Sequence, residues 1–460
     1  MLKKILCSTI GCLLTMQVAA AASLAIVSKD GKQGCIDSTG RTVIPLEYKT
    51  ISTTTDDKIS LVLVKKAEKY GVFDTEGKML LPATLDKVGA FNENVLSVKN
   101  KNKWFFYDAA GKKLCGDYQE AGEFAEGLAP VKSNGKWGFV DSTGKQVIPC
   151  EYNQAHSFSE GKAAVKHNGS WFYINKEGQP AFHYTFKKAA DFSNGFALVD
   201  GNWIIDSTGQ KLSKIQRYSY VGPFQKNGLA AVGQRYRTAS VFDYLSIGWG
   251  WGGDWGWGVG DRGWGIGGPI GHHHHHHDWG GWGGFISVNP AYMMPGNMHR
   301  GYINTKGVEI ISPTNDYVGA FVGNYALVRN DGRWGMIDTT GNTVIPFAYD
   351  GLQPFYGGMA AFVFDKKWGY IDEKNMVVIN NRFTAATPFL SDYASVVENG
   401  KGGLIDKTGK FVFPPLAIYK EIGPYNKGLA AVKRDGKWGY IDATGTVIIA
   451  PMYDTAGLLE

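Results

Sequence analysis

Hydrophobic and polar residues form short patterned segments along this chain, and the same segments return about every 34 residues. In the copy that begins at Leu128 they read LAPVK, KWGFVD and QVIPC. The segments are rich in Val, Ile and aromatic residues and are bounded by Gly, Asn, Asp and Pro, which is typical of strands joined by tight turns. Helical repeats of the same length exist, but the pattern within each copy is not helical. The sequence therefore predicts an all-β repeat protein.

Eleven copies align on an Asp or Asn that follows the second strand. These residues are Asp37, Asp74, Asp108, Asp141, Asn175, Asp206, Asn304, Asp338, Asp372, Asp406 and Asp442. Three residues later each copy has glycine, or asparagine in the case of Asn375. Glycine and asparagine tolerate positive φ, and an Asp side chain can accept a hydrogen bond from the N–H two residues on. We predict a structural turn here rather than a calcium loop, as at Asp37 and Gly40, Asp141 and Gly144, Asp338 and Gly341, and Asp442 and Gly445.

A second turn lies between the first two strands of each copy, as in KRDGK, and its residues also accept positive φ. Each repeat is therefore expected to be a three-stranded antiparallel meander followed by a connector that contains an aromatic residue and glycine. Such a unit buries too little surface alone, so neighbours must stack. Because eleven units exceed the usual four to eight blades of a propeller, we expect an open solenoid or superhelix, with a β-propeller-like arrangement as the alternative.

The segment GKWGFVDSTGKQVIP and its copies closely resemble the bacterial WG-repeat (KWG-repeat) family. The resemblance covers nearly the whole chain outside one long interval. It departs at Gln33, Tyr70 and Gly402, which replace the tryptophan, and at Phe105 and Phe172, which replace the glycine. For function the resemblance implies only a binding or scaffolding role in the bacterial envelope, without assigned chemistry.

Residues 1–22 have the pattern of a secretory signal peptide: two lysines, an apolar run and four small residues before Ser23. Removal of Lys3 and Lys4 lowers the net charge from +6 to +4, which is too weak to favour nucleic acid as a partner. No later segment is long and apolar enough to span a membrane. Three cysteines remain, an odd number, so the chain is not a disulfide scaffold. We expect a secreted, periplasmic or cell-envelope protein.

The regular spacing fails once, between Asp206 and Asn304, where the interval is 98 residues. Residues 23–232 hold repeats 1 to 6 and the start of repeat 7, and residues 301–460 hold the rest. The insertion, residues 233–300, is thus expected inside the first hairpin of repeat 7. Its tip, residues 248–284, contains sixteen glycines and half of the tryptophans.

The tip carries two candidate contact sets. The tryptophans that alternate with glycine suit a glycan or lipid surface, or self-association; they are Trp249, Trp251, Trp255, Trp257, Trp264, Trp279 and Trp282. A run of histidines can chelate Zn²⁺, Ni²⁺ or Cu²⁺ with or without a biological role; it consists of His272, His273, His274, His275, His276 and His277.

The repeated tryptophans, such as Trp137 and Trp438, offer either inter-repeat packing or ligand stacking, and packing is the simpler expectation. The chain has no nucleophile elbow, phosphate-binding loop, zinc-protease motif or paired cysteines. We therefore expect a non-enzymatic binding or interaction scaffold without a required cofactor. The alternatives are a metal-binding protein that uses the histidine run and a protein that binds glycan or a membrane surface through the tip.

Overall fold

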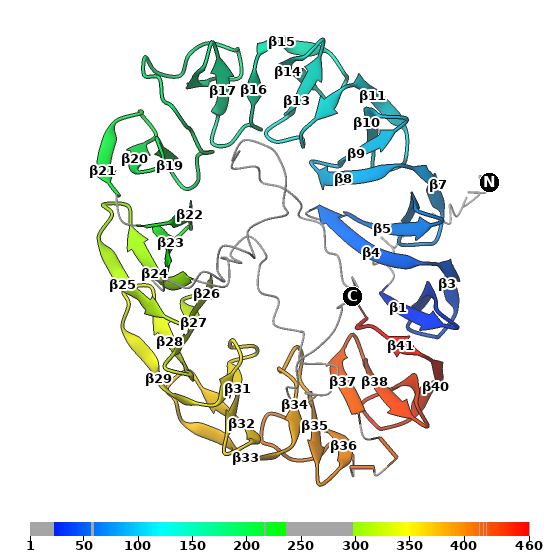
Figure 1. Ribbon diagram of the computed structural model, residues 1–460. Coiled ribbons are helices and arrows are strands. Elements are labelled where there is room, and N and C mark those ends of the chain that lie inside the picture. Colours follow the sequence, from blue (N-terminus) through cyan, green and yellow to red (C-terminus); the bar gives the residue numbers. More distant parts are fainter. Residues whose placement is uncertain are drawn as a thin grey trace, which may run out of the picture.

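The computed structural model describes residues 23–56, 59–215, 218–235, 298–413, 415–416, 418–419 and 421–459. All the regular elements in these ranges are β-strands, which confirms the all-β prediction. They form eleven small antiparallel sheets, eight with four strands and three with three. The sheets stand as blades around a ring (Figure 1). No helix in the described ranges is long and apolar enough to cross a membrane.

The blades follow the order of the repeats, and the strands of each blade run in order from the inside of the ring outwards. Blades 1 to 3 are β41 (Thr455–Ala456), β1 (Leu24–Lys29), β2 (Lys32–Asp37), β3 (Thr42–Tyr48); β4 (Thr50–Asp56), β5 (Ile59–Lys66), β6 (Lys69–Asp74), β7 (Met79–Leu85); and β8 (Lys87–Asn92), β9 (Val95–Asn100), β10 (Lys103–Asp108), β11 (Lys113–Tyr118). Blades 4 to 6 are β12 (Glu120–Ala121), β13 (Leu128–Ser133), β14 (Lys136–Asp141), β15 (Gln146–Tyr152); β16 (Gln154–Ala155), β17 (Ala163–His167), β18 (Ser170–Ile174); and β19 (Phe196–Val199), β20 (Trp203–Asp206), β21 (Lys211–Lys214).

The second half of the ring repeats this plan. Blades 7 to 9 are β22 (Tyr220–Phe224), β23 (Leu229–Arg235), β24 (Met298–Asn304), β25 (Glu309–Asn315); β26 (Tyr317–Val322), β27 (Tyr325–Asn330), β28 (Arg333–Asp338), β29 (Thr343–Tyr349); and β30 (Gly351–Leu352), β31 (Met359–Phe364), β32 (Lys367–Asp372), β33 (Val377–Phe383). Blades 10 and 11 are β34 (Ala385–Ala386), β35 (Ala394–Glu398), β36 (Lys401–Ile405); and β37 (Glu421–Asn426), β38 (Leu429–Arg434), β39 (Lys437–Ile441), β40 (Val447–Tyr453).

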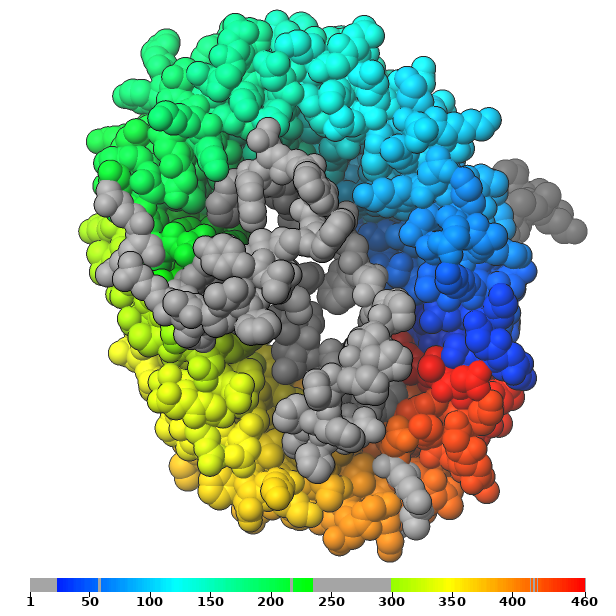
Figure 2. Space-filling model, viewed as in Figure 1, coloured from blue at the N-terminus to red at the C-terminus, as the bar shows by residue number. Residues whose placement is uncertain are grey.

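The expected open solenoid is wrong, and the propeller-like alternative is correct. In most blades the connector after the third strand of a repeat is itself a strand, and it becomes the innermost strand of the next blade. The connector that follows β40 forms β41, which pairs antiparallel with β1 and completes blade 1. The space-filling view shows blade 11 in contact with blade 1, so the described blades form a closed ring (Figure 2).

The ring has two ends, because consecutive connections in an antiparallel meander alternate between the ends of its strands. We call one end the hairpin face: it carries the hairpin connections that precede the tryptophan-bearing strands, and in most blades these are two-residue turns. At one of these turns Asp331 has φ 47° and Gly332 has φ 76°, which is the conformation of a type I′ turn. We call the opposite end the turn face: it carries the Asp-x-x-Gly turns and the connections from the innermost strand to the second.

The glycine of the tryptophan–glycine pair lies beneath the outermost strand of its blade. A Cβ on Gly439 would be 2.4 Å from the Ile449 carbonyl oxygen and 2.7 Å from the Pro451 nitrogen, so a larger residue would displace β40. Blade 3 has Phe105 at this position, and there the facing residue of the outermost strand is Gly116. A Cβ on Gly116 would be 2.3 Å from the Phe105 ring. In blade 3 the glycine is therefore on the outermost strand instead of the third strand. The two strands can still lie close together because one of the two facing residues has no side chain.

The apolar core consists of clusters that lie between neighbouring blades as well as within them. One cluster joins Ala25 and Val27 of blade 1 to Leu429 and Tyr440 of blade 11. Buried tyrosines on the third strands add a polar link, because each donates a hydrogen bond to a main-chain carbonyl of the segment that leads into the next blade. These pairs are Tyr173 with Ala190, Tyr302 with Gly319, Tyr370 with Thr387 and Tyr440 with Gly457.

Candidate functional site

The long interval leaves the ring at the hairpin of blade 7, on the hairpin face. Strands β23 and β24 pair without interruption from Leu229 opposite Asn304 to Arg235 opposite Met298. In blade 4 the same pairing runs from Leu128 opposite Asp141 and ends one pair earlier, where a two-residue turn follows. Blade 7 therefore keeps the register of an ordinary blade up to the point at which the additional residues begin.

Aromatic and cationic side chains surround the base of this hairpin. The Arg300 guanidinium lies over the Tyr317 ring, 5.3 Å from its centroid, and the Tyr317 and Trp334 rings are 5.3 Å apart. Burial is the larger influence on the Tyr317 hydroxyl and raises its pKa, while the charge of Arg300 opposes this effect. Asn315 donates from Nδ2 to the Arg300 carbonyl and fixes the end of β25 at the same place. The candidate site is thus the base of the β23–β24 hairpin on the hairpin face. Its side chains come from β24, β26 and β28.

The tip residues singled out in the sequence lie outside the described residues. This holds for the tryptophans of residues 249–282, for the histidine run of residues 272–277 and for the signal peptide of residues 1–22. In the ranges that the structure describes, no three His, Cys, Asp or Glu side chains are grouped as potential metal ligands.

The repeated tryptophans pack into the blades. Trp171 and Trp438 are buried, and Trp137 and Trp334 are half-buried against the clusters between strands. Lysine ammonium groups lie near several rings, for example Lys132 at 5.9 Å from the Trp137 centroid. Such rings have little free face for a flat ligand, and this favours the packing interpretation over ligand stacking.

The Asp-x-x-Gly turns lie together on the turn face. In the four turns named above, which begin at Asp37, Asp141, Asp338 and Asp442, Oδ1 of the Asp accepts the main-chain N–H groups two and four residues on, at 2.9 to 3.0 Å. The glycines Gly40, Gly144, Gly341 and Gly445 have φ between 83° and 87°. Partial burial opposes ionisation of Asp37, but hydrogen bonds from Thr39 and Arg41 outweigh it and lower its pKa to about 2. The hydrogen bonds that these four carboxylates accept all come from their own turns.

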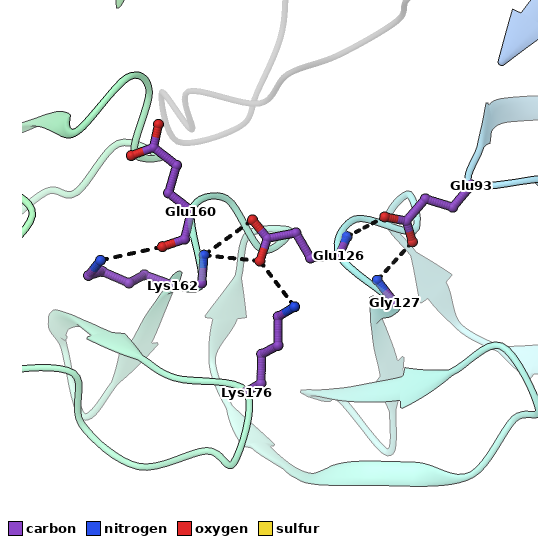
Figure 3. A network of polar contacts seen from close by, with 7 residues as sticks. Glu93, Glu126, Gly127, Glu160, Lys162 and Lys176 are labelled. Carbon is purple, nitrogen blue, oxygen red and sulfur yellow. Dashed lines mark hydrogen bonds and ion pairs between the residues drawn. The ribbon is translucent and has the colours of Figure 1, made fainter. Parts of the chain in front are cut away.

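A row of acidic side chains on the same face links consecutive blades near the inner rim, and we call these links carboxylate clasps (Figure 3). Glu93 accepts the N–H groups of Glu126 and Gly127 in the next blade. Glu126 in turn accepts the N–H of Gly161 at 3.0 Å and forms an ion pair with Lys176 at 3.3 Å. The sequence indicated the connector glycines but not these carboxylate contacts, although a Glu-Gly pair recurs in the connectors of blades 4 and 5.

A histidine and two cysteines lie at neighbouring blade contacts. His156 Nδ1 lies 2.8 Å from Asp191 Oδ1 of the next blade, and its ring packs on Trp171. Cys115 and Cys150 contact the same apolar cluster between blades 3 and 4, and both are free thiols. Burial raises the pKa of both thiols, which lowers their reactivity.

Comparison with solved structures finds many matches with low sequence identity. The crystal structure of a eukaryotic initiation factor is 11% identical, covers 96% of this chain and 98% of its own, and has a TM-score of 0.43. Hsv2 of Kluyveromyces lactis is 11% identical over 48% of this chain and 92% of its own, with a TM-score of 0.28. AztD of Citrobacter koseri, in its apo form, is 12% identical over 80% and 98%, with a TM-score of 0.25. A comparison with curated proteins finds no match.

The model of the WG containing repeat matches eleven segments of the chain. They are residues 34–70, 70–104, 116–137, 137–171, 171–200, 204–236, 301–334, 334–368, 368–401, 403–438 and 438–459. These matches cover most of the chain and equal the blades in number, and they avoid the long interval that was recognised in the sequence. The chain therefore belongs to the family of WG-repeat proteins.

Proposed function

We propose that this protein is an exported, non-enzymatic binding ring that presents the segment between β23 and β24, residues 236–297, to a partner in the cell envelope. The main support is the register of the blade 7 hairpin. Because β23 and β24 pair as in an ordinary blade, the ring does not need the additional residues to complete its sheets. Residues that the fold does not require are available for contacts with other molecules.

The chemistry of the described residues supports a binding role over a catalytic one. The Asp-x-x-Gly carboxylates serve their own turns, and the carboxylate clasps hold neighbouring blades. The segment between β23 and β24 supplies chemistry of a different kind, since it is rich in tryptophan and histidine separated by glycine. Indole rings suit the boundary between polar and apolar groups in glycans and lipid headgroup layers.

The test is a variant in which Asn-Gly replaces residues 235–298, so that Gln234 and His299 are joined by the type of turn that other blades use. We expect unchanged thermal unfolding and strongly reduced retention on cell-wall glycan or on lipid vesicles. Equal retention of the intact and shortened proteins on both materials would overturn the proposal.

Metal titration of the intact and the shortened protein tests the alternative function, which is metal binding by the histidine run. Sub-micromolar Zn²⁺ or Ni²⁺ binding that disappears in the shortened protein would support metal capture by the histidine run. Binding only at millimolar metal would count against that role.

A further inference from the structure

Positive charge gathers on the hairpin face of five neighbouring blades, from blade 11 through blades 1, 2, 3 and 4. Each of these blades has a two-residue hairpin turn before its third strand. The five turns, each taken with one strand residue on either side, contain nine basic and three acidic residues. We call the nine basic side chains the basic arc; they are Lys29, Lys32, Lys66, Lys69, Lys101, Lys103, Lys136, Arg434 and Lys437.

The excess of positive charge is confined to this part of the ring. The corresponding hairpins of blades 5, 6, 8, 9 and 10 contain four basic and four acidic residues. On the turn face of the five arc blades, the Asp-x-x-Gly turns, counted from the Asp to the residue after the glycine, contain four basic and six acidic residues. The clasp residues Glu93 and Glu126 add negative charge to that face. The small net charge of the chain therefore conceals a basic face and an acidic face.

Part of the basic arc is neutralised within the protein and part is not. Four of its side chains form ion pairs with carboxylates outside the arc: Lys66 with Glu47, Lys69 with Asp86, Lys103 with Asp117 and Lys437 with Asp454. Lys29, Lys32, Lys101 and Lys136 form no ion pair with another described residue. The first three are exposed and Lys136 is half-buried. These four lysines lie on blades 1, 3 and 4, so the unpaired charge is spread along the arc.

We propose that the hairpin face docks on a phospholipid bilayer with anionic headgroups, and that the basic arc supplies the electrostatic attraction. This inference rests on the proposed function, because it names the partner of the segment between β23 and β24. That segment leaves the ring at blade 7 on the same face, across the ring from the arc (Figure 1). Stable membrane binding generally needs two signals, such as an apolar anchor and a polybasic surface, and the tryptophan-rich segment and the arc supply one each.

The distribution of the charges favours a planar partner over a single polymer strand. The hairpins of successive blades all end at one face of the ring, so the charges of the arc lie at turns along the rim of that face. A bilayer presents negative charge in a plane and can meet these turns together, whereas a polymer strand follows one line. The same surface repels the acidic turn face, so electrostatics determines which face meets the bilayer.

The experiment measures co-sedimentation of the full chain with vesicles of phosphatidylcholine, with and without phosphatidylglycerol. We expect binding to favour the vesicles that contain phosphatidylglycerol. This preference should fall as the ionic strength rises from about 0.1 M to about 1 M, because the Debye length shortens from about 10 Å to about 3 Å. Each lysine near an anionic surface contributes about fivefold in affinity, so K29Q/K32Q/K101Q/K136Q should bind at least about a hundredfold more weakly.

The matched control removes the same number of charges from the turn face. In K78Q/K112Q/K145Q/K410Q every substituted lysine is exposed and follows the glycine of an Asp-x-x-Gly turn. The main-chain N–H of each of these residues bonds to the Asp of its turn, so the turns do not depend on the lysine side chains. We expect this control to keep its affinity for the vesicles and both variants to keep the melting temperature of the unchanged protein.

Three results would each overturn the proposal: equal binding to the two kinds of vesicle, equal loss of affinity in the two quadruple variants, or preference for an acidic cell-wall polymer over vesicles at the same phosphate concentration. The protein shortened at blade 7 separates this proposal from the proposed function. If the shortened protein loses vesicle binding while K29Q/K32Q/K101Q/K136Q retains it, the proposed function stands and the basic arc has no role. If the shortened protein binds as the intact protein does and the lysine variant does not, the proposed function fails and the basic face alone carries the binding.

Discussion

Ring closure makes a specific prediction for Leu459, the last residue that the structure describes in blade 1. Leu459 is 2% exposed and packs with Ala25 and Val27 of blade 1 and with Tyr440 of blade 11. Its carbonyl accepts a hydrogen bond from Asn426 Nδ2 at 2.8 Å. Leu459→Ala removes buried apolar surface at the junction that closes the ring and leaves every repeat otherwise intact.

The expected cost follows from large-to-small substitutions in protein cores, which destabilise by about 2–5 kcal/mol for leucine to alanine. Because the segment that follows the two-residue strand β41 can relax into the space, we expect the lower part of this range, about 2–3 kcal/mol. Each 1.4 kcal/mol changes an equilibrium constant by a factor of ten. The equilibrium constant for local opening of β41 should therefore rise roughly 30- to 150-fold.

The assay is hydrogen exchange at the amides of Asp454 and Gly457, which donate to the carbonyls of Ser28 and Ile26 at 2.8 Å across the closure. In Leu459→Ala both amides should exchange roughly 30 to 150 times faster than in the unchanged protein. The matched control is Leu212→Ala on the outer edge of blade 6, where the side chain is 44% exposed. Unchanged exchange at both amides in Leu459→Ala, or an equal effect in the control, would refute closure through β41.

Three further predictions test the repeat itself. Gly439→Ala should destabilise the protein by about 1–3 kcal/mol in urea unfolding, because its Cβ would meet the main chain of β40; Gly222→Ala, with its nearest contact at 3.4 Å, is the control and should be nearly neutral. Asp141→Asn should keep the turn, as Asn175 does, whereas Asp141→Ala should lower the melting temperature; equal melting of the two variants would contradict the turn role. Since the pKa of Asp37 is lowered to about 2, its contribution is complete above its usual pKa near 4 and is lost as the pH falls towards 2, so Asp37→Asn should flatten the acid-unfolding profile over that interval.

Local features of the fold were predictable from the sequence because each depends on a few neighbouring residues. The strands follow from short β-rich segments, and the positive φ of Gly40 and of Asn375 follows from a turn that recurs in every copy. The number of repeats also follows directly, since eleven aligned Asp or Asn residues correspond to eleven blades. The family followed from the same motif.

The candidate site was only partly accessible to the same reasoning. The long interval indicated where the chain departs from the repeat, but the grouping of Arg300, Tyr317 and Trp334 at its base depends on how blades 7 and 8 pack. The carboxylate clasps have a weak sequence signal, because a Glu-Gly pair alone does not show that Glu126 reaches Gly161 of the next blade.

The sequence by itself determined the all-β class, the repeat, its turns and its family, because these depend on residues close together in the chain. Tertiary structure decided whether the array remains open or closes. Closure depends on the small rotation from each blade to the next, accumulated over eleven blades, and the repeat motif does not encode that sum. Closure places the hydroxyl oxygens of Ser28 and Thr455, which are 427 positions apart in the chain, 2.6 Å from each other. At that distance the last connector supplies the strand that the first blade lacks.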